Sequence, residues 1–327
     1  MNMTFRKCFS PFLLIFRVGV LMVVTIGLAS PAKAEDNIPP TAQATASSSP
    51  FTPLFPREAS MPKEPYQSFV YTDTDGAKLP YLLYVPDHLE PGQKYPIVLF
   101  FHGSGERGDD DVAQLRNGIW VFTKKSNLTT YPAFVLAPQC PKGKQWVDMP
   151  WGAPSGLRPP KPSANMTLAL ALLDKVCAEQ PIDADLIYVA GLSMGGYAVW
   201  DCVTRFPEKF AAAVAVCGGG DEHTVTAEVA KVPVWAFASS DDPIVPVNRS
   251  RGMIAAMKAM GGNPHYTEYH GYNHASWGPA FNERELVPWL FAQVRGKPDT
   301  FSWQAPLDLE KQPTAPKPPT PTPTLQP

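Results

Sequence analysis

Short apolar runs that alternate with segments of helical periodicity fill the middle of the chain. Eight runs rich in β-branched and aromatic residues predict strands, and several are almost continuously apolar, as strands buried on both faces of a parallel sheet are. These runs are 67–71, 79–85, 97–101, 134–137, 186–190, 212–216, 234–238 and 266–269. Apolar residues recur at helical spacing between them, at Met166, Leu170, Leu173, Val176 and Cys177 and again at Met253, Ile254 and Met257. The pattern predicts an α/β fold, with a mostly parallel eight-stranded sheet and helices on both faces.

The two ends of the chain differ in composition from this central body, which covers 65–303. Arg6, Lys7 and Arg17 precede an apolar run over 18–28, and a small-x-small cleavage site follows at 32–34. Together they predict a signal peptide over 1–34. The run is shorter than the roughly 20 residues that span a bilayer, so removal is favoured over a retained anchor. Two further segments have compositions that predict disorder, an Ala/Ser/Pro-rich leader and a Pro-rich tail, at 35–64 and 304–327.

The charge of the chain is nearly balanced, with 28 Lys and Arg residues against 30 Asp and Glu residues. This balance offers no basic footprint for nucleic acid. A cleaved signal peptide predicts a secreted or periplasmic protein without stable membrane insertion. Four cysteines would remain in that disulfide-permissive setting, but their apolar surroundings are equally typical of core residues, so no bridge is predicted for Cys140, Cys177, Cys202 and Cys217.

A G-x-S-x-G pattern at 191–195 follows one buried strand and precedes a helical segment. The pattern alone is common by chance, but between a strand and a helix it marks the strained turn that raises a nucleophilic serine above a sheet. Gly191 and Gly195 leave room for such a turn, and the dipole of the following helix favours a developing oxyanion. The sequence therefore predicts Ser193 as a nucleophile.

A serine nucleophile needs a base, and the chain supplies candidates downstream in the order acid, then histidine. Asp241 and Asp242 follow a predicted strand, at the sheet edge where functional groups gather, and either could be the acid. His274 lies in the loop after the last strand, from which it can reach the serine. His270 ends that strand and is expected to be held there by packing.

The loop after the strand over 97–101 is rich in glycine, so its backbone N–H groups can face a site. We expect the backbone N–H groups of Ser104 and Met194 to form an oxyanion hole. His102 is expected to be a structural residue bonded within its own loop. The charged side chains that follow are expected to form a solvated face: Glu106, Arg107 and 109–111.

Five sequence blocks together resemble one branch of the α/β-hydrolases. They are HGSGERGDD, FVLAPQCP, IYVAGLSMGGYAVWD, PVWAF and YHGYNHASW, and the similarity spans about residues 66–295. The branch contains predicted peptidases and esterases related to dienelactone hydrolases, polyhydroxybutyrate depolymerases and feruloyl or acetyl-xylan esterases. The resemblance implies an α/β-hydrolase fold with Ser193 as nucleophile and His274 as base. It assigns the acid to Asp242, three residues before a Val-Pro pair, and leaves Asp241 as the second choice.

The resemblance also implies the activity, which is cleavage of carboxylic esters without a metal or organic cofactor, on a small-molecule or polysaccharide-linked substrate. A serine peptidase of the same fold would use the same three residues. A non-catalytic envelope or carbohydrate-binding protein would lack at least one of them, and all are present. Trp120, Trp146 and Trp151 are expected either to form an aromatic platform for a sugar ring or phenolic acyl group, or to pack beneath the irregular segment 142–162.

Overall fold

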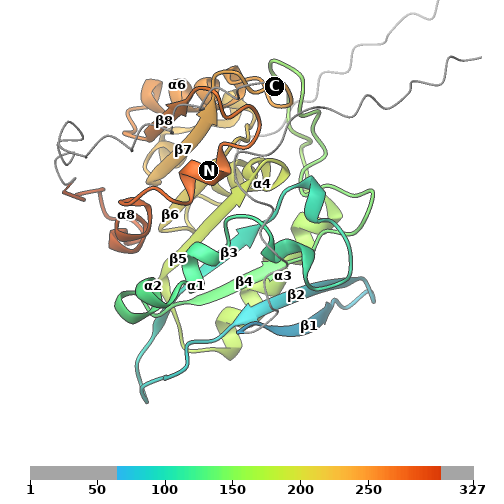
Figure 1. Ribbon diagram of the computed structural model, residues 1–327, viewed down its shortest axis with the longest axis vertical. Coiled ribbons are helices and arrows are strands. Elements are labelled where there is room, and N and C mark those ends of the chain that lie inside the picture. Colours follow the sequence, from blue (N-terminus) through green and yellow to red (C-terminus); the bar gives the residue numbers. More distant parts are fainter. Residues whose placement is uncertain (1–64, 303–327) are drawn as a thin grey trace, which may run out of the picture. The chain divides into compact units, whose positions relative to one another are not determined.

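The computed structural model describes residues 65–302, which form an eight-stranded sheet with helices on both of its faces (Figure 1). All eight predicted strands are present, and their bounds differ from the expected ones by at most four residues. They are β1 (Gln67–Thr72), β2 (Lys78–Tyr84), β3 (Tyr95–Phe101), β4 (Phe134–Pro138), β5 (Ile182–Leu192), β6 (Ala212–Val216), β7 (Val234–Ser239) and β8 (His265–Tyr269). The predicted signal peptide (1–34), leader (35–64) and tail (304–327) lie outside the described residues.

The strands lie in the order β1-β2-β4-β3-β5-β6-β7-β8. The first two strands pair antiparallel, as do β2 and β4, and every later pairing in the sheet is parallel. This arrangement confirms the predicted fold class. Because β3 to β8 run in one direction, the loops that follow them meet at one edge of the sheet.

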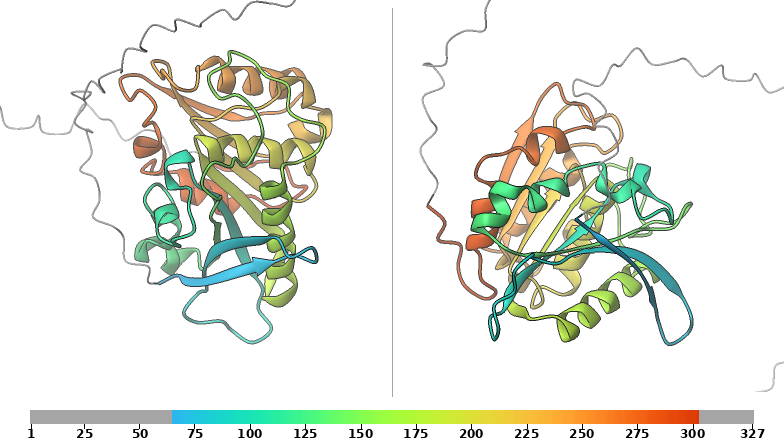
Figure 2. Two further views of the ribbon diagram at one scale, coloured as in Figure 1. Left: turned by 90° about the vertical axis from the view of Figure 1, so that its right-hand side faces the viewer. Right: turned by 60° about the horizontal axis from the view of Figure 1, so that its bottom comes forward.

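Two layers of helices cover the sheet, because successive side chains of a strand point to opposite faces. Leu99 and Phe100 of β3, for example, belong to different core clusters. The first cluster packs against α3 (Ala164–Glu179), α4 (Met194–Arg205), α5 (Ala227–Ala230) and α6 (Asn248–Ala259). The second contains residues of α1 (Trp120–Thr123), α2 (Lys125–Thr130), α7 (Trp277–Ala280) and α8 (Leu286–Ala292). Figure 2 shows the two layers on either side of the strands.

The connecting segments contain three short 3-10 helices, η1 (Ser104–Glu106), η2 (Ala113–Leu115) and η3 (Glu222–Thr224). The segment 142–162, expected to be irregular, has neither helix nor strand, and we call it the excursion loop. Ser163 ends it by accepting a hydrogen bond from the backbone N–H of Met166 at 3.0 Å, which caps α3. The four cysteines between residues 65 and 302 are all free.

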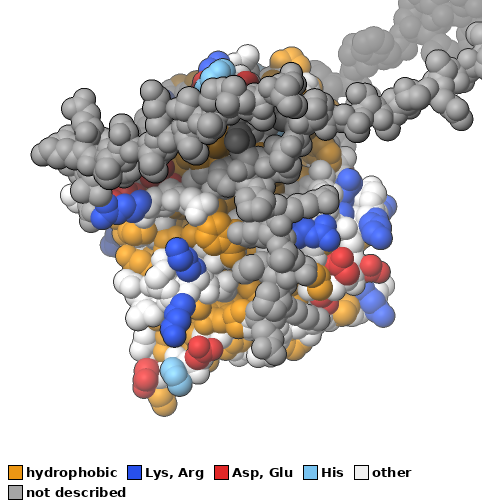
Figure 3. All heavy atoms as spheres, viewed as in Figure 1, with side chains coloured by type: hydrophobic (Ala, Val, Ile, Leu, Met, Phe, Trp, Pro, Cys, Tyr) orange, Lys and Arg blue, Asp and Glu red, His pale blue; other side chains and the backbone are white. Residues whose placement is uncertain are grey.

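The surface carries charges of both signs. On the part of the surface left uncovered in Figure 3, basic and acidic side chains stand near one another and apolar side chains lie between them. Within residues 65–302 no helix combines the length and the apolar character needed to cross a membrane.

The start of α4 packs against the sheet through glycines. A Cβ at Gly195 would lie 1.9 Å from the carbonyl oxygen of Phe101, at the end of β3. A Cβ at Gly196 would lie 2.6 Å from the carbonyl oxygen of Val216, at the end of β6, and one at Gly191 would lie 2.6 Å from the carbonyl oxygen of Gly195. No side chain fits between these backbones, so the glycines set how closely the helix approaches the strand ends.

We predict that Gly195→Ala lowers the free energy of unfolding by about 3 kcal/mol or more, because the added methyl group overlaps a backbone carbonyl that cannot move aside. Gly105→Ala is the matched control, since nothing lies within 4 Å of a Cβ at that position. Its free energy of unfolding should change by less than about 1 kcal/mol. Urea denaturation measures both, and equal losses in the two variants would contradict the packing argument.

Candidate active site

Chemically active side chains gather where the parallel strands end. Ser193 directly follows β5, Asp242 lies three residues beyond β7, and His274 lies five residues beyond β8. These residues are up to 81 positions apart in the chain. The parallel direction of the strands brings them to the same edge of the sheet, as the sequence predicted.

Ser193 sits on a strained turn between β5 and α4. Its backbone angles are φ 53° and ψ −119°, a conformation that a residue with a side chain rarely adopts. The turn is held by two hydrogen bonds, from Ser193 N–H to the Val216 carbonyl (2.9 Å) and from Tyr197 N–H to the Ser193 carbonyl (3.1 Å). The turn therefore fixes the direction of the serine hydroxyl.

A chain of hydrogen bonds joins the three predicted residues. Ser193 Oγ lies 2.8 Å from His274 Nε2, and His274 Nδ1 lies 2.7 Å from Asp242 Oδ2. Because a carboxylate accepts and does not donate, Nδ1 carries the proton and Nε2 is left to accept the serine O–H. The imidazole thus has the tautomer that a general base for serine requires.

The two adjacent acids make different contacts. The Asp242 side chain is 2% exposed, and its Oδ1 accepts hydrogen bonds from the backbone N–H groups of Ile244 (2.8 Å) and Val245 (2.9 Å) while Oδ2 faces His274. Asp242 is thus the acid in contact with the histidine. His270 bonds instead to the Ser240 hydroxyl at 2.9 Å.

Asp241 binds the backbone of the loop that carries His274. Its Oδ1 accepts from Ser239 Oγ (2.5 Å) and from Gly271 N–H (3.1 Å), and its Oδ2 accepts from Asn273 N–H (3.4 Å). Gly271 and Asn273 have φ values of 84° and 48°, so the loop turns sharply before His274. Asp241 therefore holds this loop in place and does not contact the imidazole.

The predicted oxyanion donors begin two helices. Met194 is the first residue of α4 and Ser104 the first of η1, and N–H groups at the start of a helix have no partner within it. A Cβ at Gly103 would lie 3.5 Å from Ser193 Cβ, so the loop that carries Ser104 runs beside the serine. Arg107 Nε donates to the Ser104 carbonyl at 2.8 Å and fixes that peptide.

His102 is a structural residue, as expected. It is 1% exposed. Its Nδ1 donates to the Gly103 carbonyl at 2.6 Å and its Nε2 accepts from Cys140 N–H at 2.9 Å. Burial lowers the pKa of His102 to about 4. The ring is therefore neutral and links the loop after β3 to the loop after β4.

The expectation of a solvated face at 106–111 is wrong for Glu106. This side chain is 6% exposed, and its Oε1 accepts from Asn117 Nδ2 at 2.5 Å. Burial raises the pKa of the Glu106 carboxyl, and the bond from Asn117 opposes that rise. A Cβ at Gly103 would lie 2.9 Å from Glu106 Oε2, which places the carboxyl close to the serine loop.

Gln139 organises this loop and was missed in the sequence. It is fully buried just after β4, where its Nε2 donates to the Glu106 carbonyl (3.1 Å) and to Asp110 Oδ1 (2.9 Å). Its Oε1 accepts from Asp111 N–H at 2.9 Å. The only signal of this role was a polar residue at the end of an apolar strand.

The three tryptophans do not form one platform. Trp146 is completely buried, stacks edge-on against Phe101 and donates from Nε1 to the His102 carbonyl at 3.2 Å. Trp151 packs on the same core cluster, whereas Trp120 packs on the cluster of the opposite face. The complete burial of Trp146 thus removes it from any shared surface, whereas Trp120 and Trp151 are partly buried on opposite faces of the sheet.

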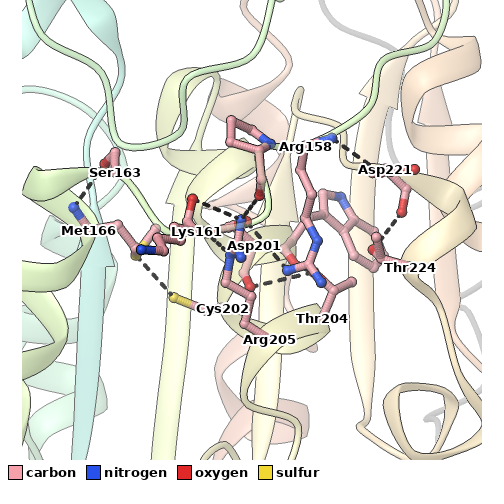
Figure 4. Close-up of polar contacts among 12 residues, drawn as sticks. Arg158, Lys161, Ser163, Met166, Asp201, Cys202, Thr204, Arg205, Asp221 and Thr224 are labelled. Carbon is pink, nitrogen blue, oxygen red and sulfur yellow. Dashed lines mark hydrogen bonds and ion pairs between the residues drawn. The ribbon is translucent and has the colours of Figure 1, made fainter. Parts of the chain in front are cut away.

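The excursion loop is bonded to the C-terminal end of α4. Arg205 donates from Nε to both carboxylate oxygens of Asp201 (2.8 and 2.9 Å), from Nη1 to the Pro160 carbonyl (2.7 Å) and from Nη2 to the Pro159 carbonyl (2.6 Å). Arg158 of the loop lies 3.7 Å from the same Asp201. Figure 4 shows these arginines on either side of the buried carboxylate.

The strand order, the strained serine turn and the Asp242–His274–Ser193 chain define an α/β-hydrolase. Residues 90–284 match the phospholipase/carboxylesterase family. This match covers more than half of the chain, and the chain belongs to that family of hydrolases. Within the described part of the chain, no group of three or more His, Cys, Asp or Glu side chains is arranged to hold a metal ion.

Individual relatives include esterases. A solved structure of a thermostable esterase is 37% identical, with a TM-score of 0.65, over 70% of this chain and 63% of that chain. A poly(3-hydroxybutyrate) depolymerase of Ralstonia pickettii is 28% identical over 173 residues, which are 51% of this chain and 34% of that protein. NocK of Nocardia uniformis subsp. tsuyamanensis, a proposed esterase, is 26% identical over 76% of this chain and 70% of that protein. This chain thus spans about a third of the depolymerase.

The buried His102 predicts a pH dependence of stability. Its pKa is about 4 in the folded protein and about 6.5 in the unfolded chain, so between these values the unfolded chain binds more protons. The free energy of unfolding should fall by about 3 kcal/mol from this residue as the pH falls from 7 to 4.

The comparison that isolates this effect is between the wild type and His102→Asn, by urea denaturation at several pH values. At pH 7 the variant should be the less stable of the two, because it loses buried hydrogen bonds. The difference in free energy of unfolding between the wild type and His102→Asn should decrease by about 3 kcal/mol as the pH falls to 4. A gap that stays constant over this range would show that His102 does not stay neutral in the fold.

Proposed function

We propose that this chain is an exported serine hydrolase that cleaves carboxylic esters through an acyl-enzyme on Ser193. One observation carries the proposal, the chain of hydrogen bonds at 2.8 and 2.7 Å that joins Ser193, His274 and Asp242 at the strained turn. A turn with φ 53° has an energetic cost, and its retention here is explained by a hydroxyl that must point at a substrate. Export rests on the signal-peptide pattern over 1–34.

The geometry supports a two-step reaction. Ser193 Oγ attacks the ester carbonyl while His274 Nε2 takes its proton, and Asp242 stabilises the imidazolium that forms. The backbone N–H groups of Ser104 and Met194 stabilise the negative charge on the carbonyl oxygen. His274 returns the proton to the departing alcohol, and the acyl group remains on Ser193. A water molecule, deprotonated by His274, then releases the carboxylic acid.

Ester substrates are favoured over peptides by the relatives that carry sequence similarity. The thermostable esterase is a solved structure that is 37% identical to this chain. The acylaminoacyl peptidase of Pyrococcus horikoshii is 14% identical, so its similarity concerns the fold alone. The hydroxybutyrate depolymerase extends the proposal to polymer-linked as well as small-molecule esters.

We predict that the chain without residues 1–34 hydrolyses p-nitrophenyl esters of short acyl groups, or methyl ferulate, and that Ser193→Ala lowers kcat by about 10⁴-fold or more. The hydroxyl is the attacking group, so no neighbouring side chain replaces it. Ser240→Ala serves as the control, because this hydroxyl bonds to His270 on the protein surface. Comparable loss in both variants, or undiminished turnover in Ser193→Ala, would contradict the proposal.

Substitution of Asp241 and of Asp242 should lower kcat by different amounts. Asp242→Asn should lower kcat by about 10⁴-fold, because the amide no longer holds the imidazole in the tautomer that accepts the serine proton. Asp241→Asn should lower kcat by only about tenfold, since it weakens the support of the His274 loop while leaving the imidazole contact. Steady-state kinetics on one ester measures both, and a larger loss in Asp241→Asn would reverse the assignment of the acid.

A further inference from the structure

Arg249 is a buried cation whose charge is not compensated within the described residues. It lies in the first turn of α6 and is 2% exposed. Its Nε donates to the Tyr197 hydroxyl at 3.3 Å, and its guanidinium carbon lies 5.4 Å from the centre of the Tyr197 ring. Between residues 65 and 302, its Nη1 and Nη2 have no hydrogen-bond partner and no carboxylate at ion-pair distance.

This state is costly, because arginine stays protonated in proteins and a buried charge requires compensation. Arg205, whose side chain is 7% exposed, shows the usual compensation of such a charge. Arg205 bonds to both oxygens of Asp201 and to loop carbonyls through Nη1 and Nη2. Arg249 has a contact with an aromatic ring instead, and the N–H groups at the end of its fork are unused. Those two nitrogens are the pair that a carboxylate binds in a bidentate manner.

The elements around Arg249 are those that build the catalytic edge. Tyr197 lies one turn after Ser193 in α4, and α6 begins shortly after Asp242. A Cβ at Gly219 would lie 2.5 Å from Arg249 Cβ, so the loop after β6 closes one side of the arginine. Val216, the last residue of β6, accepts the hydrogen bond from Ser193 N–H.

The excursion loop approaches the guanidinium of Arg249 at Gly156. A Cβ at Gly156 would lie 3.3 and 3.4 Å from Nη1 and Nη2 of Arg249, but glycine has none. The Trp151 carbonyl accepts a hydrogen bond from the Tyr197 hydroxyl at 3.0 Å, and Trp151 Nε1 is another buried donor without a partner. Both residues that contact the Tyr197 hydroxyl thus carry a donor without a partner, and an anion reaches those of Arg249 only if the chain at Gly156 moves aside.

We propose that Arg249 binds a free carboxylate of the substrate, so that this hydrolase prefers esters that carry a second, ionised carboxyl group. This inference rests on the proposed ester hydrolysis. The carboxylate would accept hydrogen bonds from Nη1 and Nη2 and neutralise the guanidinium charge. A neutral ester of the same length leaves that charge uncompensated, which makes its binding weaker.

The test compares matched anionic and neutral esters. The first pair, mono-p-nitrophenyl adipate and p-nitrophenyl hexanoate, has acyl chains of equal length that differ in the terminal carboxylate. The second pair, 3-acetoxybenzoate and phenyl acetate, differs in a carboxylate on the leaving group. The wild type should show the higher kcat/KM for the anionic ester in at least one pair. Arg249→Met should lower the ratio of anionic to neutral kcat/KM by about 10- to 100-fold in that pair, mainly through KM.

Arg251→Met is the matched control, because it removes one positive charge from the same helix. Arg251 is exposed and pairs with Glu268 at 2.5 Å, and its removal should change the ratio by less than threefold. Equal ratios in the wild type and Arg249→Met, or equal changes in the two variants, would overturn the inference. A circular-dichroism melt confirms that each variant is folded.

A binding measurement separates this inference from the proposed function. Ser193→Ala protein is titrated calorimetrically with monobutyl adipate and butyl hexanoate, and the experiment is repeated with Arg249→Met added. Tighter binding of the anionic ester that is lost in the double variant supports the inference even where no ester is hydrolysed. Equal affinities for the two esters contradict it. Failure of the wild type to cleave any ester contradicts the proposed function alone.

Discussion

The backbone of Ser193, with φ 53° and ψ −119°, is the constraint on which the rest of the site depends. A serine remains in this conformation only if its surroundings leave no alternative. Here the Val216 carbonyl holds its N–H, and the carbonyl of Phe101 lies where a side chain at position 195 would be. The strained turn is thus stabilised by the close approach of α4 to the ends of β3 and β6, and the catalytic geometry depends on the packing of the sheet.

Polar side chains around this turn hold the neighbouring loops in place through hydrogen bonds. Gln139 binds the loop after β3, and His102 links that loop to the one after β4. On the other side, Asp241 holds the sharp turn before His274 while Asp242 contacts the imidazole. Each of these groups makes at least two hydrogen bonds, and for the buried side chains of Gln139, His102 and Asp242 these bonds offset the loss of water. The site is therefore supported by separate networks beneath its serine and its histidine.

The sequence predicted the sheet and the three residues of the hydrogen-bonded chain because each follows a recognisable strand, and the parallel direction of these strands then brings the residues to one edge. Position after the strand did not separate Asp241 from Asp242, because only the direction of their side chains decides between neighbouring acids, and the assignment to Asp242 came from the resemblance alone. Glu106 was expected in solvent because nothing local marks a carboxyl as buried when its cover, Asn117, comes from another segment. The prediction that the three tryptophans form one surface was wrong for a similar reason. The face of the sheet on which each tryptophan packs is set by segments that are distant in the sequence.

The central claim is that His274 activates Ser193, and covalent labelling with a fluorophosphonate followed by peptide mass spectrometry tests it most directly. Such a probe reacts with an activated serine and spares ordinary hydroxyls. We predict one label per chain, located on Ser193, and a labelling rate that falls by orders of magnitude in His274→Ala. An unlabelled protein, a label on another serine, or an equal rate in the histidine variant would contradict it.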